Sequence, residues 1–258
     1  MRIFFLGIEG APELPNFLTL LHSFYTDSRI IAYLHSWQNI FFSILIGALI
    51  SIVFYLGASK KEMIPGSFQN FIEWIVESFH SLVISILGPK GEQFVPFLGT
   101  LFIYILCMNL FGLIPLMHSP SSSLDITVAL AICVFCRVQY LNIKNMGVKG
   151  FIYHLAGSPK DTASWLMVPL MFPIELLTQF SRPITLALRL FGNILGEKIL
   201  IGFFAIVGVT LLYFIPIQTP FMFLGLLTSL MQAMVFTLLS TIYILLSDPH
   251  AEEHSTNH

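Results

Sequence analysis

The sequence from Pro173 to Lys198 reads PIELLTQFSRPITLALRLFGNILGEK and sets charged side chains into an apolar stretch. These side chains are Glu175, Arg182, Arg189, Glu197 and Lys198. An ionisable residue at the centre of a membrane costs about 2.5–3.5 kcal/mol on insertion scales, so its presence requires an explanation. The pattern favours an ion or proton path, and the structural alternative is a salt-bridge ladder that holds helices together.

Most polar side chains of this stretch share one face of a helix with Arg189. At about 100° per residue, five of them fall with Arg189 in an arc of about 100°: Glu175, Thr178, Arg182, Asn193 and Glu197. Lys198 falls on the opposite side. At about 1.5 Å per residue, Glu175 lies about 21 Å from Arg189 along the axis, and Glu197 about 12 Å in the other direction. Two offset proton paths would need such a carboxylate on each side of one arginine.

The composition of the whole chain is that of a membrane protein. Of its 258 residues, 56% are hydrophobic and only 10% are charged, and the mean hydropathy is +0.83. A soluble domain carries about 25% charged residues. The net charge of −2 and the absence of a basic stripe give no indication of a nucleic-acid partner.

The apolar segments predict an all-α integral membrane domain over residues 37–246, since a helix needs about 20 apolar residues to cross the hydrocarbon core. Predicted spans cover residues 37–59, 94–117 and 124–141, and a final hairpin covers 165–215 and 219–246. The segment 165–215 is too long for one helix perpendicular to the membrane. Residues 67–87 repeat apolar side chains every three or four positions, which predicts an amphipathic helix at the interface.

The basic residues predict the orientation. Lys60 and Lys61 follow the first span, and Arg137, Lys144, Lys149 and Lys160 cluster after the third. If consecutive spans cross the membrane in opposite directions, both clusters lie on the same side of it. The positive-inside rule identifies that side as the cytoplasm. Residues 1–36 are then outside, and the tail 247–258 is cytoplasmic.

Neither the cysteines nor the histidines indicate a metal, a cofactor or a catalytic residue. Cys133 and Cys136 have the spacing of a metal or redox pair, but no second pair exists, and two small buried thiols are the simpler interpretation. The eight histidines lie outside the centres of the predicted spans, which disfavours a haem or quinone enzyme.

The motif around Arg189 resembles one family. Residues 188–193, LRLFGN, match a motif of subunit a of F-type ATP synthases, and Glu175 stands fourteen residues before the arginine, as in bacterial members. Ser181-Arg182-Pro183 resembles their Ser-Lys-Pro. Residues 108–115, which read MNLFGLIP, and 221–233, which read FMFLGLLTSLMQA, resemble two further segments. The likeness covers residues 30–248, with Gln232 at the polar position of the last helix.

The resemblance implies an N-terminal span, an interfacial helix, a transmembrane hairpin and a long tilted hairpin that faces a rotating ring of c subunits. It implies two half-channels that load and unload protons on the ring carboxylates, separated by Arg189. Proton translocation is then expected to involve Arg189, Glu197, Glu175, Asn193 and Gln232. The channel lining is expected to include Arg182, Thr178, Asp125 and Ser229. For Asp125, an ordinary helix cap is an equal alternative.

Physical chemistry explains why arginine suits the divide. A guanidinium stays protonated at any physiological pH, so it cannot relay a proton itself. It favours the ionised form of a nearby carboxylate and so helps to expel that group's proton. The implied partners are the c-ring, the b-subunit peripheral stalk, the remaining ATP synthase subunits and the lipid of a bacterial inner membrane. A thylakoid membrane is the less favoured alternative.

The sequence departs from the family in two places. Bacterial members commonly carry glutamate nine residues after the arginine, whereas here Glu197 is eight residues after it and Lys198 takes the ninth place. Many also carry histidine seven residues before the glutamine of the last helix, where this chain has Gly225. An autonomous ion channel or secondary transporter is the alternative function, although no internal repeat supports it. The choice between H⁺ and Na⁺ stays open.

Overall fold

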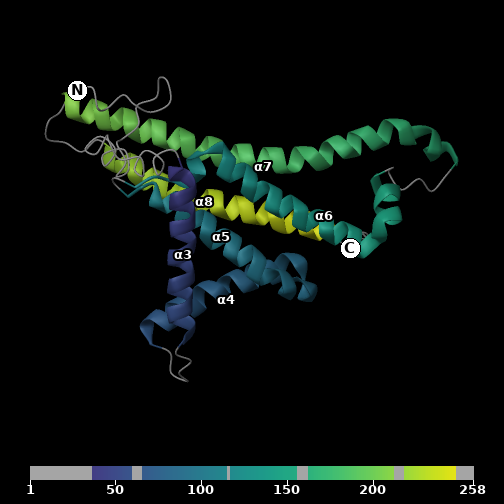
Figure 1. The fold of residues 1–258 in the computed structure, drawn as a ribbon, viewed down its shortest axis with the longest axis horizontal. Helices are drawn as coiled ribbons and strands as arrows, with labels where there is room; N and C mark the ends of the chain where they lie inside the picture. Colours follow the sequence, from purple (N-terminus) through teal and green to yellow (C-terminus); the bar gives the residue numbers. More distant parts are fainter. Residues whose placement is uncertain (1–36, 60–65, 115–116, 156–161, 212–217, 248–258) are drawn as a thin grey trace.

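The computed structural model describes residues 37–59, 66–114, 117–155, 162–211 and 218–247, and all secondary structure in these ranges is helical. The elements are α3 (Gln38–Ser59), α4 (Ser67–Leu87), η2 (Pro89–Phe94), α5 (Val95–Phe111), η3 (Pro120–Ser122), α6 (Leu124–Leu155), α7 (Thr162–Leu211) and α8 (Gln218–Leu245) (Figure 1). The predicted all-α class is confirmed. The N-terminal segment, the Lys60–Lys61 pair and the tail lie outside the described residues.

Five segments are long and apolar enough to cross a membrane: Gln38–Gly57, Ser67–Leu87, Gly91–Phe111, Leu124–Phe151 and Thr219–Leu245. The chain is therefore a multi-pass membrane protein. Helix α4 is among the five, so length and composition alone do not distinguish an interfacial from a spanning position for it. Helix α7, which carries Arg189, is not among them.

The long apolar region folds as one helix. Helix α7 has 50 residues and continues through Pro169, Pro173 and Pro183. At about 1.5 Å per residue it is about 75 Å long, whereas the hydrocarbon core is about 30 Å thick. A helix of this length cannot stand perpendicular to the membrane over its whole extent.

Two helices end at other places than the predicted spans. Helix α5 stops at Phe111 rather than near residue 117, ahead of Gly112 and of Pro115, a residue type that ends helices. Helix α6 continues past residue 141 to Leu155. It bends at Gly147, whose φ of 69° belongs to the left-handed region that glycine adopts readily.

Helices α6, α7 and α8 lie side by side, each antiparallel to its neighbour in the chain, and α3 crosses their common direction (Figure 1). Phe135 of α6 meets Phe180 of α7, with ring centroids 5.8 Å apart. At the other end of α7, Phe204 stacks on Phe221 of α8 at 3.8 Å. The ring contacts at the two ends of α7 are thus made with different helices.

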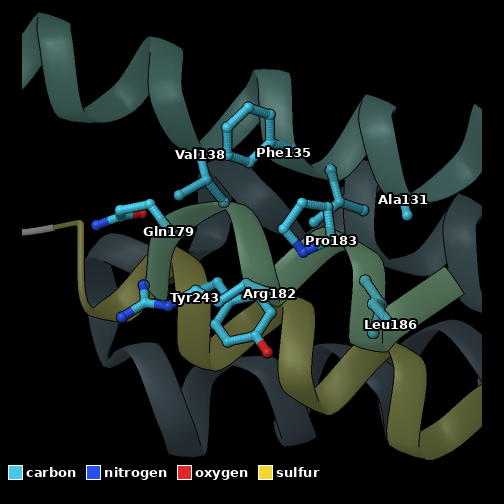
Figure 2. Close-up of a pocket in the computed structure, with 9 residues that line it drawn as sticks. Ala131, Phe135, Val138, Gln179, Arg182, Pro183, Leu186 and Tyr243 are labelled. Atoms are coloured by element: carbon cyan, nitrogen blue, oxygen red, sulfur yellow. The ribbon is translucent and has the colours of Figure 1, made fainter. Parts of the chain in front are cut away.

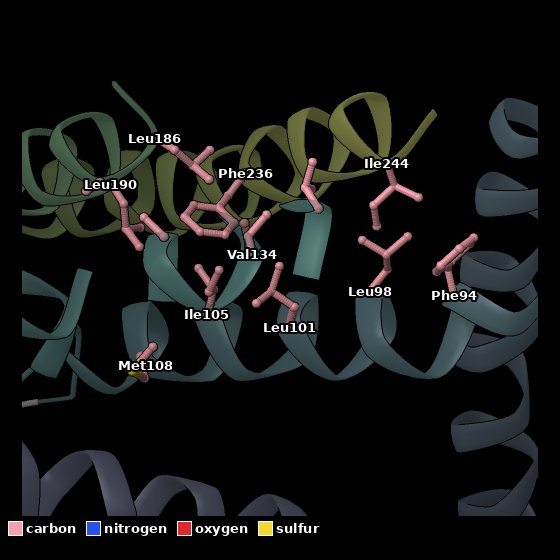
Figure 3. Close-up of a cluster of buried hydrophobic side chains, with 14 of the residues drawn as sticks. Phe94, Leu98, Leu101, Ile105, Met108, Val134, Leu186, Leu190, Phe236 and Ile244 are labelled. Atoms are coloured by element: carbon pink, nitrogen blue, oxygen red, sulfur yellow. The ribbon is translucent and has the colours of Figure 1, made fainter. Parts of the chain in front are cut away.

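The core lies where α5, α6, α7 and α8 meet. Figure 3 shows Leu98 and Ile105 of α5, Val134 of α6, Leu190 of α7 and Phe236 of α8 in this cluster, all buried. Many large apolar residues on the outer faces are exposed, as suits a protein surrounded by lipid. Cys133 and Cys136 are free thiols on such an outer face of α6, so the expectation that they are buried was wrong.

Gly112 allows α5 to approach the turn that leads to α6. A Cβ at this position would stand 2.5 Å from Ser119 Cβ and 3.3 Å from the Asn109 carbonyl oxygen. Neither atom is the end of a flexible side chain, so the turn itself would have to move. Gly99, on the same helix, has room for a Cβ, with Phe79 at 3.5 Å.

We expect Gly112→Ala to destabilise the chain by about 1–3 kcal/mol, the usual cost of overpacking. Gly99→Ala, the matched control, should be neutral or slightly stabilising, because alanine is the better helix former. Thermal unfolding of the purified complex in detergent measures both. Equal melting temperatures for the two variants would contradict the close approach at Gly112.

Candidate functional site

Arg189 lies at the edge of the face of α7 that is packed against other helices. Leu186, Ala187, Leu190 and Ile194 are buried on that face, whereas Arg189 is exposed. Thr178 is exposed as well, and Glu175, Arg182, Asn193 and Glu197 are partly buried. The predicted polar arc is thus divided: Arg189 points out of the isolated chain, while the carboxylates turn toward neighbouring helices.

Glu197 contacts α8. Thr228 Oγ1 donates a hydrogen bond to Glu197 Oε2 at 3.1 Å. The carboxylate fills the space beside Gly225, because a Cβ there would stand 2.6 Å from Glu197 Oε1 and 2.9 Å from Leu113 Cδ2. The two departures from the family pattern, at Glu197 and at Gly225, therefore meet in one place.

Lys198 turns to a different neighbour. Its Nζ donates to Ser122 Oγ at 2.7 Å and lies 3.3 Å from Nδ1 of His118. His118 is 6% exposed, and this burial, with the Lys198 ammonium second, lowers the pKa of His118 to about 3. The histidine is therefore neutral, and its Nδ1 can accept a hydrogen bond from the ammonium.

A buried polar network joins the turn at η3 to α8. Ser121 Oγ donates to Asn109 Oδ1 at 2.7 Å, and Asn109 Nδ2 donates to the Ser229 carbonyl oxygen at 3.5 Å. One turn further along α8, Gln232 is 7% exposed. Within the described part of the chain, Ser229 Oγ and Gln232 Nε2 are buried without a hydrogen-bond partner. Such orphaned groups are typical of sites that hold water.

A second network lies at the other end of α7, against α6. Gln179 Nε2 donates to Glu175 Oε1 at 3.3 Å and Gln139 Nε2 to Gln179 Oε1 at 3.5 Å. Asn142 Nδ2 donates in turn to Gln139 Oε1 at 3.4 Å. Gln179 and Asn142 are both buried. The chain of side-chain amides thus leads from Glu175 into the helix interface.

Arg182 is placed differently from Arg189. Its guanidinium lies over the ring of Tyr243 of α8, 5.3 Å from the centroid, a distance at which a cation is attracted to an aromatic face. Figure 2 shows both beside Gln179, in a small cavity that is otherwise apolar. The cavity holds about 10 Å³, close to the least that one water needs.

The structure brings the predicted residues into two separate groups. Glu197, Ser229 and Gln232 belong to the end of the α7–α8 pair near η3, and Glu175 and Arg182 belong to the opposite end. Asn193 lies between them, while Asp125 is exposed in the first turn of α6 and stays consistent with either of its interpretations. None of the described residues forms a cluster of three or more metal-ligating side chains.

Sequence reasoning missed several polar residues of these groups: Asn109, His118, Gln139, Gln179 and Thr228. One signal could have found Thr228, because Gly225, Thr228 and Gln232 recur at three- and four-residue spacing on one face of α8. Gln139 and Gln179 meet from segments 40 residues apart, which no local pattern reveals.

Comparison with known proteins identifies the family. Residues 40–245 match the model of the ATP synthase A chain. ATP synthase subunit a of Protochlamydia amoebophila is 62% identical over 242 residues, which cover 92% of this chain and 89% of that relative. Subunit a of Geotalea daltonii is 40% identical, over 78% of this chain and 82% of that relative. Subunit a of Oleidesulfovibrio alaskensis is 37% identical, over 83% of this chain and 88% of that relative.

The resemblance drawn from the segment around Arg189 is confirmed over nearly the whole chain, including both helices of the final hairpin. By model and by relatives alike, the chain belongs to the family of ATP synthase subunit a, the proton-channel subunit of the Fo sector.

Proposed function

We propose that this chain forms two offset half-channels, one at each end of the α7–α8 pair, with Arg189 as the barrier between them. The observation that carries the proposal is the separation of two polar networks along α7. Glu197 contacts Thr228 near η3, and Glu175 contacts Gln179 at the opposite end. Arg189 lies between them on the sequence and is exposed on the outer face.

The exposure of Arg189 supports a counter-charge that comes from another subunit. A guanidinium on an apolar outer face in a membrane is costly unless an anion meets it. Leu188 and Ile184, large apolar residues of the same part of α7, are exposed too and offer no charge. A carboxylate of the c-ring would pair with Arg189 as it passes and lose its proton there.

The outer half-channel is proposed to run between the η3 turn and α8. Glu197 is its acidic group, and the orphaned atoms of Ser229 and Gln232 suit a chain of waters toward it. Asn109 continues this route through Ser121 to the turn. Asp125 would stand at its entrance, and Asn193 between Glu197 and the arginine.

The inner half-channel is proposed to lead along Glu175, Gln179 and Gln139, with Arg182 and Thr178 in its lining. The basic residues of α6, Lys144 and Lys149, belong to the same end and support its cytoplasmic side. With the remaining ATP synthase subunits as partners, the c-ring is proposed to face Arg189. The b-subunit stalk is proposed as a further partner, and a bacterial inner membrane as the location.

We expect Arg189→Ala to abolish ATP-driven proton pumping in inverted vesicles, because no other permanent charge separates the half-channels. Arg189→Lys should also be severely impaired, since an amine that the c-ring covers can lose its proton. Arg182→Ala, which removes a cation held over Tyr243, should lower pumping and leave coupling detectable. Copurification of the c-ring checks assembly. Robust pumping by assembled Arg189→Ala would contradict the assignment.

Gly225→Ala tests the place of the Glu197 carboxylate. The new methyl group overlaps the carboxylate oxygen, which can swing away at little cost, and alanine favours the helix. The complex should therefore assemble normally while proton pumping falls between about tenfold and a hundredfold, as displaced functional groups typically cause. Gly66→Ala, where a Cβ would meet nothing within 4 Å, is the control. Normal pumping by Gly225→Ala would exclude Glu197 in this position as a functional group.

Single cysteines test the two water paths, after replacement of Cys107, Cys133 and Cys136. Cysteines that replace Glu197 or Gln232 should react with small thiol reagents chiefly from outside. A cysteine that replaces Glu175 should react chiefly from the cytoplasm. Reaction of both carboxylate positions from the same side would rule out offset half-channels.

A further inference from the structure

Two successive residues of α7 are held by two different elements. Glu197 accepts a hydrogen bond from Thr228 of α8, and Lys198 donates one to Ser122 of η3. Side chains of successive residues on a helix point about 100° apart. These two contacts add to the packing of Leu190 and Ile194 in fixing the local rotation of α7, and with it the direction in which Glu197 points.

The contact of Lys198 involves two acceptors. Its ammonium is charged and donates at 2.7 Å to Ser122 Oγ, and hydrogen bonds of this kind are about twice as strong as those between neutral groups. A second acceptor, Nδ1 of the buried and neutral His118, lies 3.3 Å away. The His118 ring in turn lies against Phe42 of α3, with centroids 6.3 Å apart. Lys198 therefore reaches a site formed by η3, the residues just before it and α3.

The contact of Glu197 with α8 is longer. Thr228 Oγ1 donates to the carboxylate at 3.1 Å, and the carboxylate fills the space beside Gly225. A hydrogen bond to a charged group contributes about 1.5–3 kcal/mol, so the direction of the Glu197 side chain is sensitive to a further contact at the neighbouring residue. Loss of the contact at Lys198 would let this part of α7 shift and carry the carboxylate away from Thr228.

We propose that Lys198 is a positioning residue of the outer half-channel: its contacts with Ser122 and His118 hold α7 in the rotation that aims Glu197 at Thr228 and Gly225. The proposal rests on the proposed role of Glu197 as the acidic group of that path.

The charges around Glu197 make the proposal testable. Helices α5 and α8 carry no Asp, Glu, Lys, Arg or His within their bounds. On α7 the charged neighbours of Glu197 are Lys198 itself and, two turns away, Arg189, and in the turn His118 faces Lys198. Loss of Lys198 thus removes one nearby positive charge and one positioning contact. Losing the charge favours proton uptake by Glu197, whereas losing the contact disfavours it.

The test is the rate of ATP synthesis by the whole complex in membrane vesicles, measured against the proton concentration on the outer side at a fixed membrane potential. If Lys198→Met leaves Glu197 correctly aimed for only a third of the time, the half-saturating proton concentration rises about threefold, because apparent affinity falls with the competent fraction. The maximal rate and the copurified c-ring should be retained. Lys198→Arg, which keeps a charged donor, should restore most of the affinity, and Ser122→Ala should reproduce part of the loss.

Lys144→Met, which removes an exposed lysine of α6, is the matched control and should leave the curve unchanged. A lower half-saturating concentration in Lys198→Met would indicate a purely electrostatic role and overturn the proposal, as would an unchanged one. If Lys198→Met fails to assemble, Ser122→Ala decides by the same criterion. Normal synthesis by Glu197→Gln would instead refute the proposed function itself.

Discussion

A guanidinium that cannot lose its proton, carried by an apolar helix in a membrane, is the constraint on which the other features of this chain depend. Arg189 is exposed on α7, so the isolated chain leaves the charge for a partner to meet. The carboxylates behave in the opposite way, because Glu175 and Glu197 both turn into helix interfaces where amide or hydroxyl groups donate to them. Helix α7 thus exposes its arginine on the outer face, whereas its carboxylates contact neighbouring helices.

The length of α7 makes that division possible. A helix of 50 residues has room for two polar networks that do not touch, one against α6 and one against α8 and the η3 turn. Between them, Leu186, Ala187 and Leu190 are buried apolar residues. In the proposed mechanism, water that enters from either end would meet this apolar stretch and the arginine beside it.

The sequence predicted the helical class and the family correctly, because apolar length, helical spacing and the motif around Arg189 are local properties. It did not predict where α5 and α6 end, since Gly112 and Gly147 act through the backbone rather than through hydrophobicity. It also placed Arg189 and Glu197 in one arc. The structure separates them by burial, because the edge of the packed face passes between them.

What the sequence by itself determined is the identity of the groups: a motif around Arg189, two flanking carboxylates, and a glycine and a lysine where the resemblance to the family implies histidine and glutamate. Only the tertiary structure decided how these substitutions fit together. Glu197 occupies the volume beside Gly225, and Lys198 reaches Ser122 and His118, residues 76 and 80 positions away in the chain. The physical reason is that side-chain volume and hydrogen bonding are satisfied between helices, and helical periodicity fixes only the direction in which each side chain leaves its own helix.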